Sequence, residues 1–204
     1  MIEKRLYTPE AGELRAYTEG DKRMISGYAA KFAVQSRLLA EGGKLFTEIL
    51  RQGAFKDVIA NDVYLTFNHN RDQVFARTIN NTLTLTEDEV GLRFEAVLND
   101  TTGAQDLYKM IERGDVFENS FAFMVDKEGQ QWSRSANGDN IRQISRISKL
   151  LDVSVVTHAA YPDTEVSVVR GLNEYIEQQE PTPISFEREL SIIAVHNLKS
   201  KNYK

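Results

Sequence analysis

The stretch Lys149-Leu150-Leu151-Asp152-Val153-Ser154-Val155-Val156 is the most apolar strand that the sequence predicts, and one charge interrupts it. A short run rich in valine and leucine favours a buried β-strand. A carboxylate inside such a strand costs free energy unless it has a partner. We therefore expect Asp152 to be paired, either with a histidine that it orients or with an arginine such as Arg142 or Arg146.

The segments around this strand have the same short, alternating pattern. Strands are predicted over residues 13–18, 23–34, 63–67, 82–86, 91–98, 119–125 and 166–169, with hairpin arms at 132–135 and 141–147. One helix is predicted over 101–113, capped by Thr101 or Thr102 and followed by Gly114. A helical turn is expected over 54–60. The sequence thus predicts a mainly β domain with few helices and mostly antiparallel strands.

Composition and charge narrow the function classes. The 204 residues contain no cysteine, which excludes disulfides, thiolate metal sites and a cysteine nucleophile. The net charge of −5 argues against binding nucleic acid through bulk electrostatics. No run is apolar enough for a membrane span, and the charged first residues do not resemble a signal peptide. We expect a domain over 1–171, followed by a polar linker and C-terminal tail over 172–204.

The few histidines limit where proton-transfer chemistry could lie. His69 follows the strand predicted over 63–67 and has polar neighbours, so it could act as a base near neutral pH or be an ordinary loop residue. His158 follows the apolar strand, and His196 lies in the tail. No spacing of a metal site is present, and no phosphate-binding loop is found, so neither a metal nor a cofactor is expected.

Ser120 is the candidate nucleophile. In the strand predicted over 119–125, Phe121, Phe123 and Val125 share one face, which is expected to be core. Ser120 and Ala122 share the other face, where small side chains leave room for a substrate backbone. The simpler interpretation is a strand serine bonded to a neighbouring carbonyl. The motif Gly-x-Ser-x-Gly is missing around Ser120, so an α/β-hydrolase is not supported.

Several segments together resemble a known family. They are SGYAAKF (26–32), EILRQGAF (48–55), FNHN (67–70), GLRF (91–94), SFAF (120–123) and LDVSVV (151–156), which leads into AYP (160–162). In this order and at these spacings the chain resembles the prohead maturation proteases of tailed phages, which are distantly similar to the herpesvirus assemblins. The resemblance implies an antiparallel, barrel-like β core and a serine endopeptidase without a cofactor.

The resemblance also implies roles for individual residues. His69 would be the base and Ser120 the nucleophile, and Asp152 would take the place of the family's carboxylate in a Glu-Val-Ser segment. His158 is the alternative third member, by analogy with the second histidine of the assemblins. The implied substrate is the scaffolding region of the phage major capsid protein, together with the protease itself. The implied location is the procapsid in the host cell cytoplasm, and self-association is compatible with this interpretation.

Two other functions remain open from the sequence. The chain could be an inactive capsid-assembly or scaffold protein with a protease-like fold. It could also be an unrelated β-rich binding module in which His69, Ser120 and Asp152 are separate structural residues. Contact between Ser120 and His69 would distinguish the serine protease from both of these alternatives.

Overall fold

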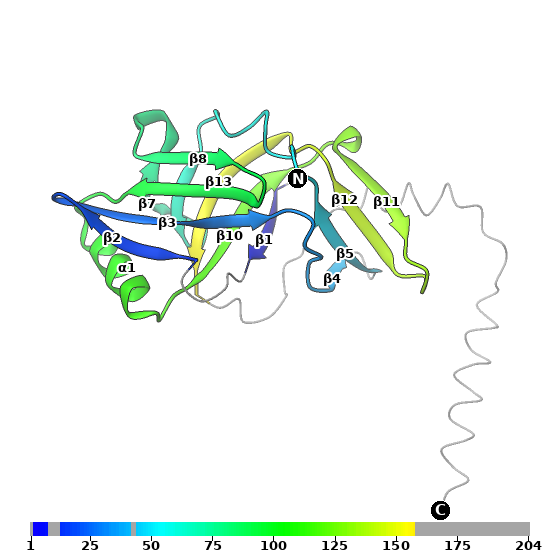
Figure 1. Ribbon diagram of the computed structural model, residues 1–204, viewed down its shortest axis with the longest axis horizontal. Coiled ribbons are helices and arrows are strands. Elements are labelled where there is room, and N and C mark those ends of the chain that lie inside the picture. Colours follow the sequence, from blue (N-terminus) through cyan, green and yellow to red (C-terminus); the bar gives the residue numbers. More distant parts are fainter. Residues whose placement is uncertain (1, 8–12, 42–43, 158–204) are drawn as a thin grey trace, which may run out of the picture. The chain divides into compact units, whose positions relative to one another are not determined.

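The computed structural model describes residues 2–7, 13–41 and 44–157, and a five-stranded sheet runs through this part of the chain (Figure 1). The strand order is β1-β10-β13-β6-β7. These strands are β1 (Glu3–Tyr7), β10 (Glu118–Met124), β13 (Lys149–Val156), β6 (Tyr64–Phe67) and β7 (Asn70–Arg77). All neighbours are antiparallel except β13 and β6, which run parallel. The most apolar strand therefore lies at the centre of the sheet.

Two four-stranded sheets complete the described part of the chain. One has the order β2-β3-β9-β8 and the other the order β11-β12-β5-β4. Their strands are β2 (Arg15–Glu19), β3 (Lys22–Lys31), β9 (Gly91–Val97), β8 (Leu83–Glu87), β11 (Gln130–Arg134), β12 (Asn140–Ile144), β5 (Lys44–Leu50) and β4 (Leu39–Glu41). The predicted mainly β class is confirmed. The strands form three separate sheets, however, and these sheets are not closed into a barrel.

The helix α1 (Thr102–Arg113) forms where the sequence predicted it. The Thr101 side chain accepts a hydrogen bond from the backbone N–H of Ala104, which caps the first turn. Gly114 ends the helix with a φ of 82°, a conformation that glycine adopts without steric cost. The buried face packs against β2 and β3, and it consists of Ala104, Leu107, Tyr108 and Ile111.

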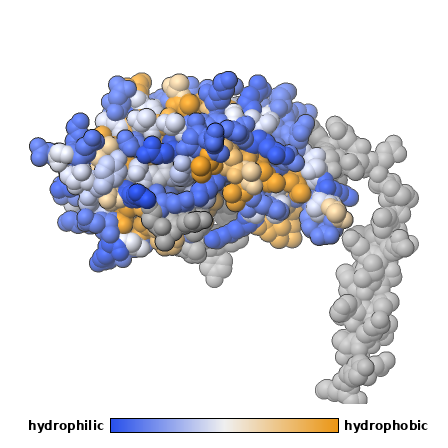
Figure 2. Space-filling model, viewed as in Figure 1, coloured by the Kyte–Doolittle hydropathy of each residue, from blue (hydrophilic) through white to orange (hydrophobic). Residues whose placement is uncertain are grey.

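The largest buried side chains come from all three sheets. Fully buried members include Ile25, Leu65, Leu92, Phe94, Phe121, Phe123 and Ile144. As predicted, Phe121 and Phe123 lie in the core, where their rings stack with centroids 4.8 Å apart. Figure 2 shows polar residues over most of the face in view, with an apolar area toward β4 and β5. The core therefore supports the central sheet through the face opposite Ser120.

Some elements differ from the sequence-based expectation. Strands β1, β4, β5 and β7 were not predicted, and the η1 (Thr78–Asn80) and η2 (Lys127–Gly129) turns are short 3-10 helices. Residues 52–60 form consecutive turns, and one of them has the helical bond from the Ile59 N–H to the carbonyl oxygen of Phe55 at 3.1 Å. The strand predicted over 63–67 is followed by a tight reversal after Phe67, and the chain continues as β7. The strand predicted over 166–169 and the domain boundary after residue 171 lie outside the described residues.

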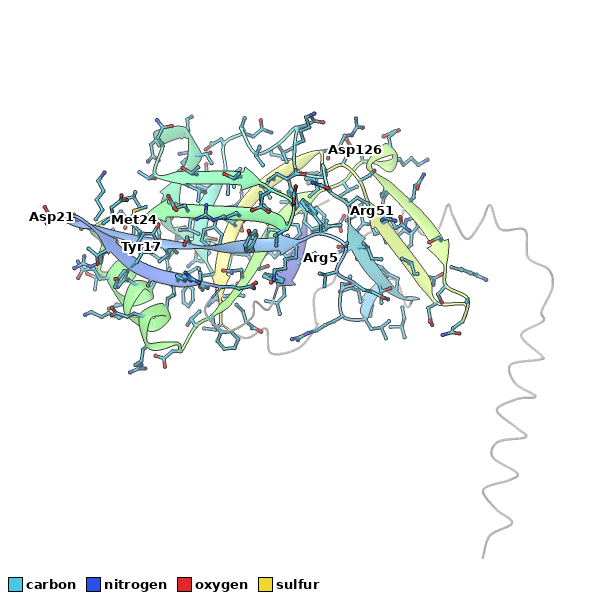
Figure 3. All side chains as sticks on the ribbon, viewed as in Figure 1. Arg5, Tyr17, Asp21, Met24, Arg51 and Asp126 are labelled. Carbon is cyan, nitrogen blue, oxygen red and sulfur yellow. The ribbon has the colours of Figure 1, made fainter. Side chains whose placement is uncertain are left out.

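A group of buried charges joins the central sheet to β5 and β12. Arg5, whose side chain extends from β1 toward β5 (Figure 3), donates to both carboxylate oxygens of Glu48 at 2.8 Å. Arg142 donates to Glu48 at 2.8 Å and to Glu3 at 3.0 Å, and Arg5 also binds Glu3 at 2.8 Å. The Arg142 residue is 0% exposed. The suggestion that Arg142 pairs with Asp152 is therefore wrong, because its guanidinium is engaged by these two glutamates.

The charges of this group set the ionisation of Glu48. Burial alone would raise the pKa of its carboxyl, but the nearby charges of Arg5 and Arg142 and their hydrogen bonds outweigh burial and lower it. A carboxyl whose folded pKa is lowered stabilises the fold fully above its unfolded pKa. That contribution is lost as the pH falls through the folded pKa.

Replacement of Glu48 by glutamine is expected to lower the free energy of unfolding by about 3–5 kcal/mol at neutral pH, because it leaves two buried guanidinium groups undercompensated. Urea unfolding measures this change. As the pH falls below ~4.5, the wild type should lose stability more steeply than Glu48→Gln. The matched control is Asp62→Asn, which breaks an exposed pair with Arg77 and should have little effect. Equal losses in the two variants would contradict the structural role of the buried group.

The backbone of β3 passes so close to residue 91 that only glycine fits there. A Cβ atom at this position would lie 2.0 Å from the carbonyl oxygen of Ala30 on β3. Gly91 pairs with Lys31 at the end of the β3–β9 ladder, so a side chain there would force the two strands apart.

Gly91→Ala is accordingly expected to lower the free energy of unfolding by about 2 kcal/mol or more, because backbone cannot move aside as a flexible side chain can. Gly103→Ala in α1 is the control. Its new Cβ would come no closer than 3.4 Å to another residue, and alanine favours a helix over glycine. Thermal unfolding of both variants checks the difference, and a Gly91→Ala protein as stable as Gly103→Ala would contradict it.

Candidate active site

Ser120 and Asp152 lie on adjacent strands and on the same face of the central sheet. In the β10–β13 ladder, Ser120 pairs with Ser154 and Ala122 pairs with Asp152. A register shift follows Ala122, after which Phe123 pairs with Leu150. The extra residue on β13 is thus Leu151, directly before the carboxylate. The ladder therefore fixes the spacing between a hydroxyl and a carboxylate.

His69 reaches this face from a tight turn. Asn68 and His69 have φ values of 53° and 57°, and they connect Phe67 of β6 to Asn70 of β7, which pair with each other. A two-residue hairpin with both central residues at positive φ is typical of a type I′ turn. Asparagine and histidine are among the non-glycine residues that enter this region most often. The local sequence therefore supports the turn that carries the imidazole.

The turn lies directly beside β13. The backbone N–H of Asn68 donates to the carbonyl oxygen of Val155 at 3.0 Å. The parallel ladder between β6 and β13 ends at the same place, with Phe67 opposite Val155. The imidazole is consequently placed next to the strand that carries Asp152.

One imidazole bridges the other two side chains. His69 Nδ1 lies 2.6 Å from Asp152 Oδ1, and His69 Nε2 lies 2.6 Å from Ser120 Oγ. An ionised carboxylate can only accept, so Nδ1 carries the hydrogen and Nε2 accepts that of the serine hydroxyl. The side chains of His69 and Asp152 are 9% and 4% exposed, and Ser120 is 4% exposed. This arrangement can remove a proton from the serine hydroxyl.

The comparisons with known proteins identify the family. The sequence model of the caudovirus prohead serine proteases matches residues 11–178. The chain belongs to this family. A search of curated proteins found no match. Among solved structures, the capsid assembly protease of bacteriophage T4 is similar, with 14% identity and a TM-score of 0.45, and the alignment covers 76% of this chain and 96% of that one.

The structure brings three of the predicted site residues of this prohead protease family member together. His69, Ser120 and Asp152 come from a turn and two strands, and they share one hydrogen-bonded chain. The alternative third member, His158, and the tail residue His196 lie outside the described residues. Among residues 2–7, 13–41 and 44–157, no group of three or more histidines, aspartates and glutamates could hold a metal ion.

Two further observations concern this family member. Within the described part of the chain, no helix has both the length and the apolar character that crossing a membrane requires. Sequence reasoning also missed the roles of Asn68, whose side chain binds Thr157, and of Ser154, which binds the backbone N–H of His69. The dipeptide Asn68-His69 carried a signal for the turn alone, since both residue types favour a left-handed conformation.

Proposed function

We propose that the chain is a serine endopeptidase that cleaves the scaffolding region of the phage major capsid protein while the procapsid matures. The observation that carries this proposal is the imidazole of His69, which contacts a serine hydroxyl through one nitrogen and a carboxylate through the other, each at 2.6 Å. Both nitrogens are thus engaged as acyl transfer by serine requires. The family match supports the same chemistry.

The first step forms an acyl-enzyme. Ser120 Oγ attacks the carbonyl carbon of the scissile peptide while its proton moves to His69 Nε2. A C–O bond forms, and the tetrahedral intermediate then breaks its C–N bond. His69 gives the proton to the leaving amine, so the serine ends as an ester and the imidazole returns to its neutral form.

The second step regenerates the enzyme. A water molecule attacks the ester carbonyl, and His69 Nε2 accepts a proton from this water as the new C–O bond forms. When the ester C–O bond breaks, the same proton returns to Ser120 Oγ. The carboxyl end of the first fragment then leaves, and the resting hydrogen bonds are restored.

Asp152 is the third member that we propose. Its Oδ1 accepts the hydrogen of His69 Nδ1, which fixes the tautomer that leaves Nε2 free to accept a proton. The carboxylate also stabilises the imidazolium that forms during attack. Because both groups are almost fully buried, their attraction acts through a lower dielectric than that of water. Nδ1 offers only one hydrogen and Asp152 accepts it, so we propose Asp152 in place of His158.

The substrate follows from the family. The family consists of caudovirus prohead serine proteases, and we propose that the scaffolding region of the capsid protein is the peptide that this member cuts. We propose that the chain works inside the procapsid in the host cell cytoplasm and also cuts itself. We further propose a protease domain over 1–171 and a separable linker and tail over 172–204, within which that self-cleavage would occur.

Ser120→Ala is expected to lower the rate of capsid-protein cleavage by at least about 10⁴-fold, because no nucleophile remains while the fold loses only one oxygen. A fluorophosphonate probe should label the wild type and fail to label this variant. Mass spectrometry should find the aged variant intact and the aged wild type shortened.

The control for this variant is Ser148→Ala, which removes an exposed hydroxyl bonded only to the carbonyl of Met124. Ser148→Ala should be labelled like the wild type. Cleavage of the capsid protein by Ser120→Ala at the wild-type rate, with a wild-type unfolding curve, would refute the proposed function.

Asp152→Asn is expected to lower kcat by about 10⁴-fold with little change in KM. The amide has the same shape, but its NH₂ group can donate to Nδ1 and so favours the wrong tautomer. Asp72→Asn removes an exposed carboxylate near the same turn and should keep the wild-type kcat. Steady-state kinetics on a capsid-derived peptide measures both. If Asp152→Asn is as active as Asp72→Asn, then Asp152 is not the third member.

A further inference from the structure

The base of this site stands on a turn of two residues, so something has to hold that turn in place. A hairpin turn is ordinarily fixed only by the two strands that it joins. Here the outer strand β7 has an irregular ladder with β6, with register shifts on both sides of Thr66. The turn at Asn68 and His69 therefore needs contacts beyond β6 and β7.

One such contact is the bond from the Asn68 backbone N–H to the carbonyl oxygen of Val155. Ser154 supplies another. Its hydroxyl oxygen accepts the backbone N–H of His69 itself at 2.9 Å. The hydroxyl donates its own hydrogen to the carbonyl oxygen of Thr66 or of Val155, each at 3.2 Å. Ser154 is 2% exposed, so water does not compete for these bonds. A strand serine can satisfy its hydroxyl by donating to a neighbouring carbonyl alone. The additional bond from the backbone N–H of His69 links Ser154 to the turn.

Asn68 supplies a further contact through its side chain. Its amide oxygen accepts the backbone N–H of Thr157 at 3.0 Å and the hydroxyl of the same residue at 3.3 Å. Thr157 directly follows the end of β13. His69 is thus tied to β13 by its backbone N–H. Asn68 is tied to Val155 by its backbone N–H and to Thr157 by its side chain.

Ser154 lies close in the sheet to both Asp152 and Ser120, so its contact with the turn affects the alignment of all three site residues. It lies two residues after Asp152 on β13 and directly opposite Ser120 on β10. One short piece of β13 therefore carries the acid, pairs with the nucleophile and binds the backbone of the base. If the turn moved relative to β13, the imidazole would lose alignment with Ser120 and Asp152 together.

We propose that Ser154 and Asn68 are positioning residues, which hold the turn on β13 so that the imidazole of His69 stays aligned with Ser120 and Asp152. Neither is assigned contact with substrate. The inference rests on the proposed function, because alignment matters only if His69 acts as the base. Misplacement of a catalytic group by about 1 Å can cost about 100-fold in rate.

The chain offers a matched control at the other end of β6. The hydroxyl of Thr78 accepts the backbone N–H of Val63 at 2.8 Å and donates to the carbonyl oxygen of Asn61 at 2.7 Å. This is the same kind of contact as that of Ser154, a side-chain hydroxyl between a backbone donor and a backbone acceptor. It involves none of the three site residues.

The experiment compares Ser154→Ala with Thr78→Val in the full-length chain. Ser154→Ala is expected to lower kcat on a capsid-derived peptide about 10- to 100-fold, with KM within about twofold of the wild type. Thr78→Val should keep the wild-type kcat, even if its unfolding temperature falls by as much as that of Ser154→Ala. Proton NMR gives a second readout. The downfield resonance of His69 Nδ1–H should broaden or vanish in Ser154→Ala and persist in Thr78→Val.

Asn68→Gly keeps the proposal testable if Ser154→Ala fails to fold. Glycine accepts a positive φ and the position is exposed, so the fold should survive, and kcat should fall at least about threefold as the side-chain contact is lost. Wild-type kcat and an unchanged resonance in folded Ser154→Ala, or in Asn68→Gly, would overturn the inference. So would equal losses of kcat in Ser154→Ala and Thr78→Val. Full activity of Ser120→Ala would instead refute the proposed function.

Discussion

A buried carboxylate at the centre of the five-stranded sheet sets the conditions for everything around it. Asp152 is 3% exposed and lies in the most apolar strand, so its charge needs a hydrogen-bonding partner inside the fold. That partner is the imidazole of His69 at 2.6 Å, and it can arrive only because β6 runs parallel to β13 and turns back at its end. The core beneath, with Phe121 and Phe123, makes the sheet rigid enough to keep this spacing.

The same part of the chain satisfies its other buried charges differently. Glu3, Arg5, Glu48 and Arg142 neutralise one another in a group where every member has an oppositely charged neighbour. Arg142 is thereby kept away from Asp152, although the sequence alone made it an equal candidate. The two groups differ in what is left over. The four-residue group is balanced in charge, and Arg142 also donates to the side-chain oxygen of Gln130 at 2.8 Å. The pair of His69 and Asp152 instead leaves one ring nitrogen that binds a hydroxyl.

The sequence predicted the fold where local signals were strong. Alternation and turn residues located most strands, and Thr101 and Gly114 marked the ends of α1. β1 and β4 are short and become strands only through their neighbours, which a local pattern does not record. For the site, the buried charge and the order of segments singled out Asp152, Ser120 and His69. The turn under His69 and the contact of Ser154 depend on pairing between segments far apart in the chain, so they became visible only in the structure.

The distances along the chain between the three site residues have a consequence for timing. The contact of His69 with Ser120 spans 51 residues and that with Asp152 spans 83. Such long loops close late, because the entropy of closing them is lost before the contacts are gained. β13 is the last described strand, and no site exists until it has inserted between β10 and β6. A chain in which β13 has not yet joined the sheet thus lacks the assembled site, which delays the proposed hydrolytic activity until the central sheet is complete.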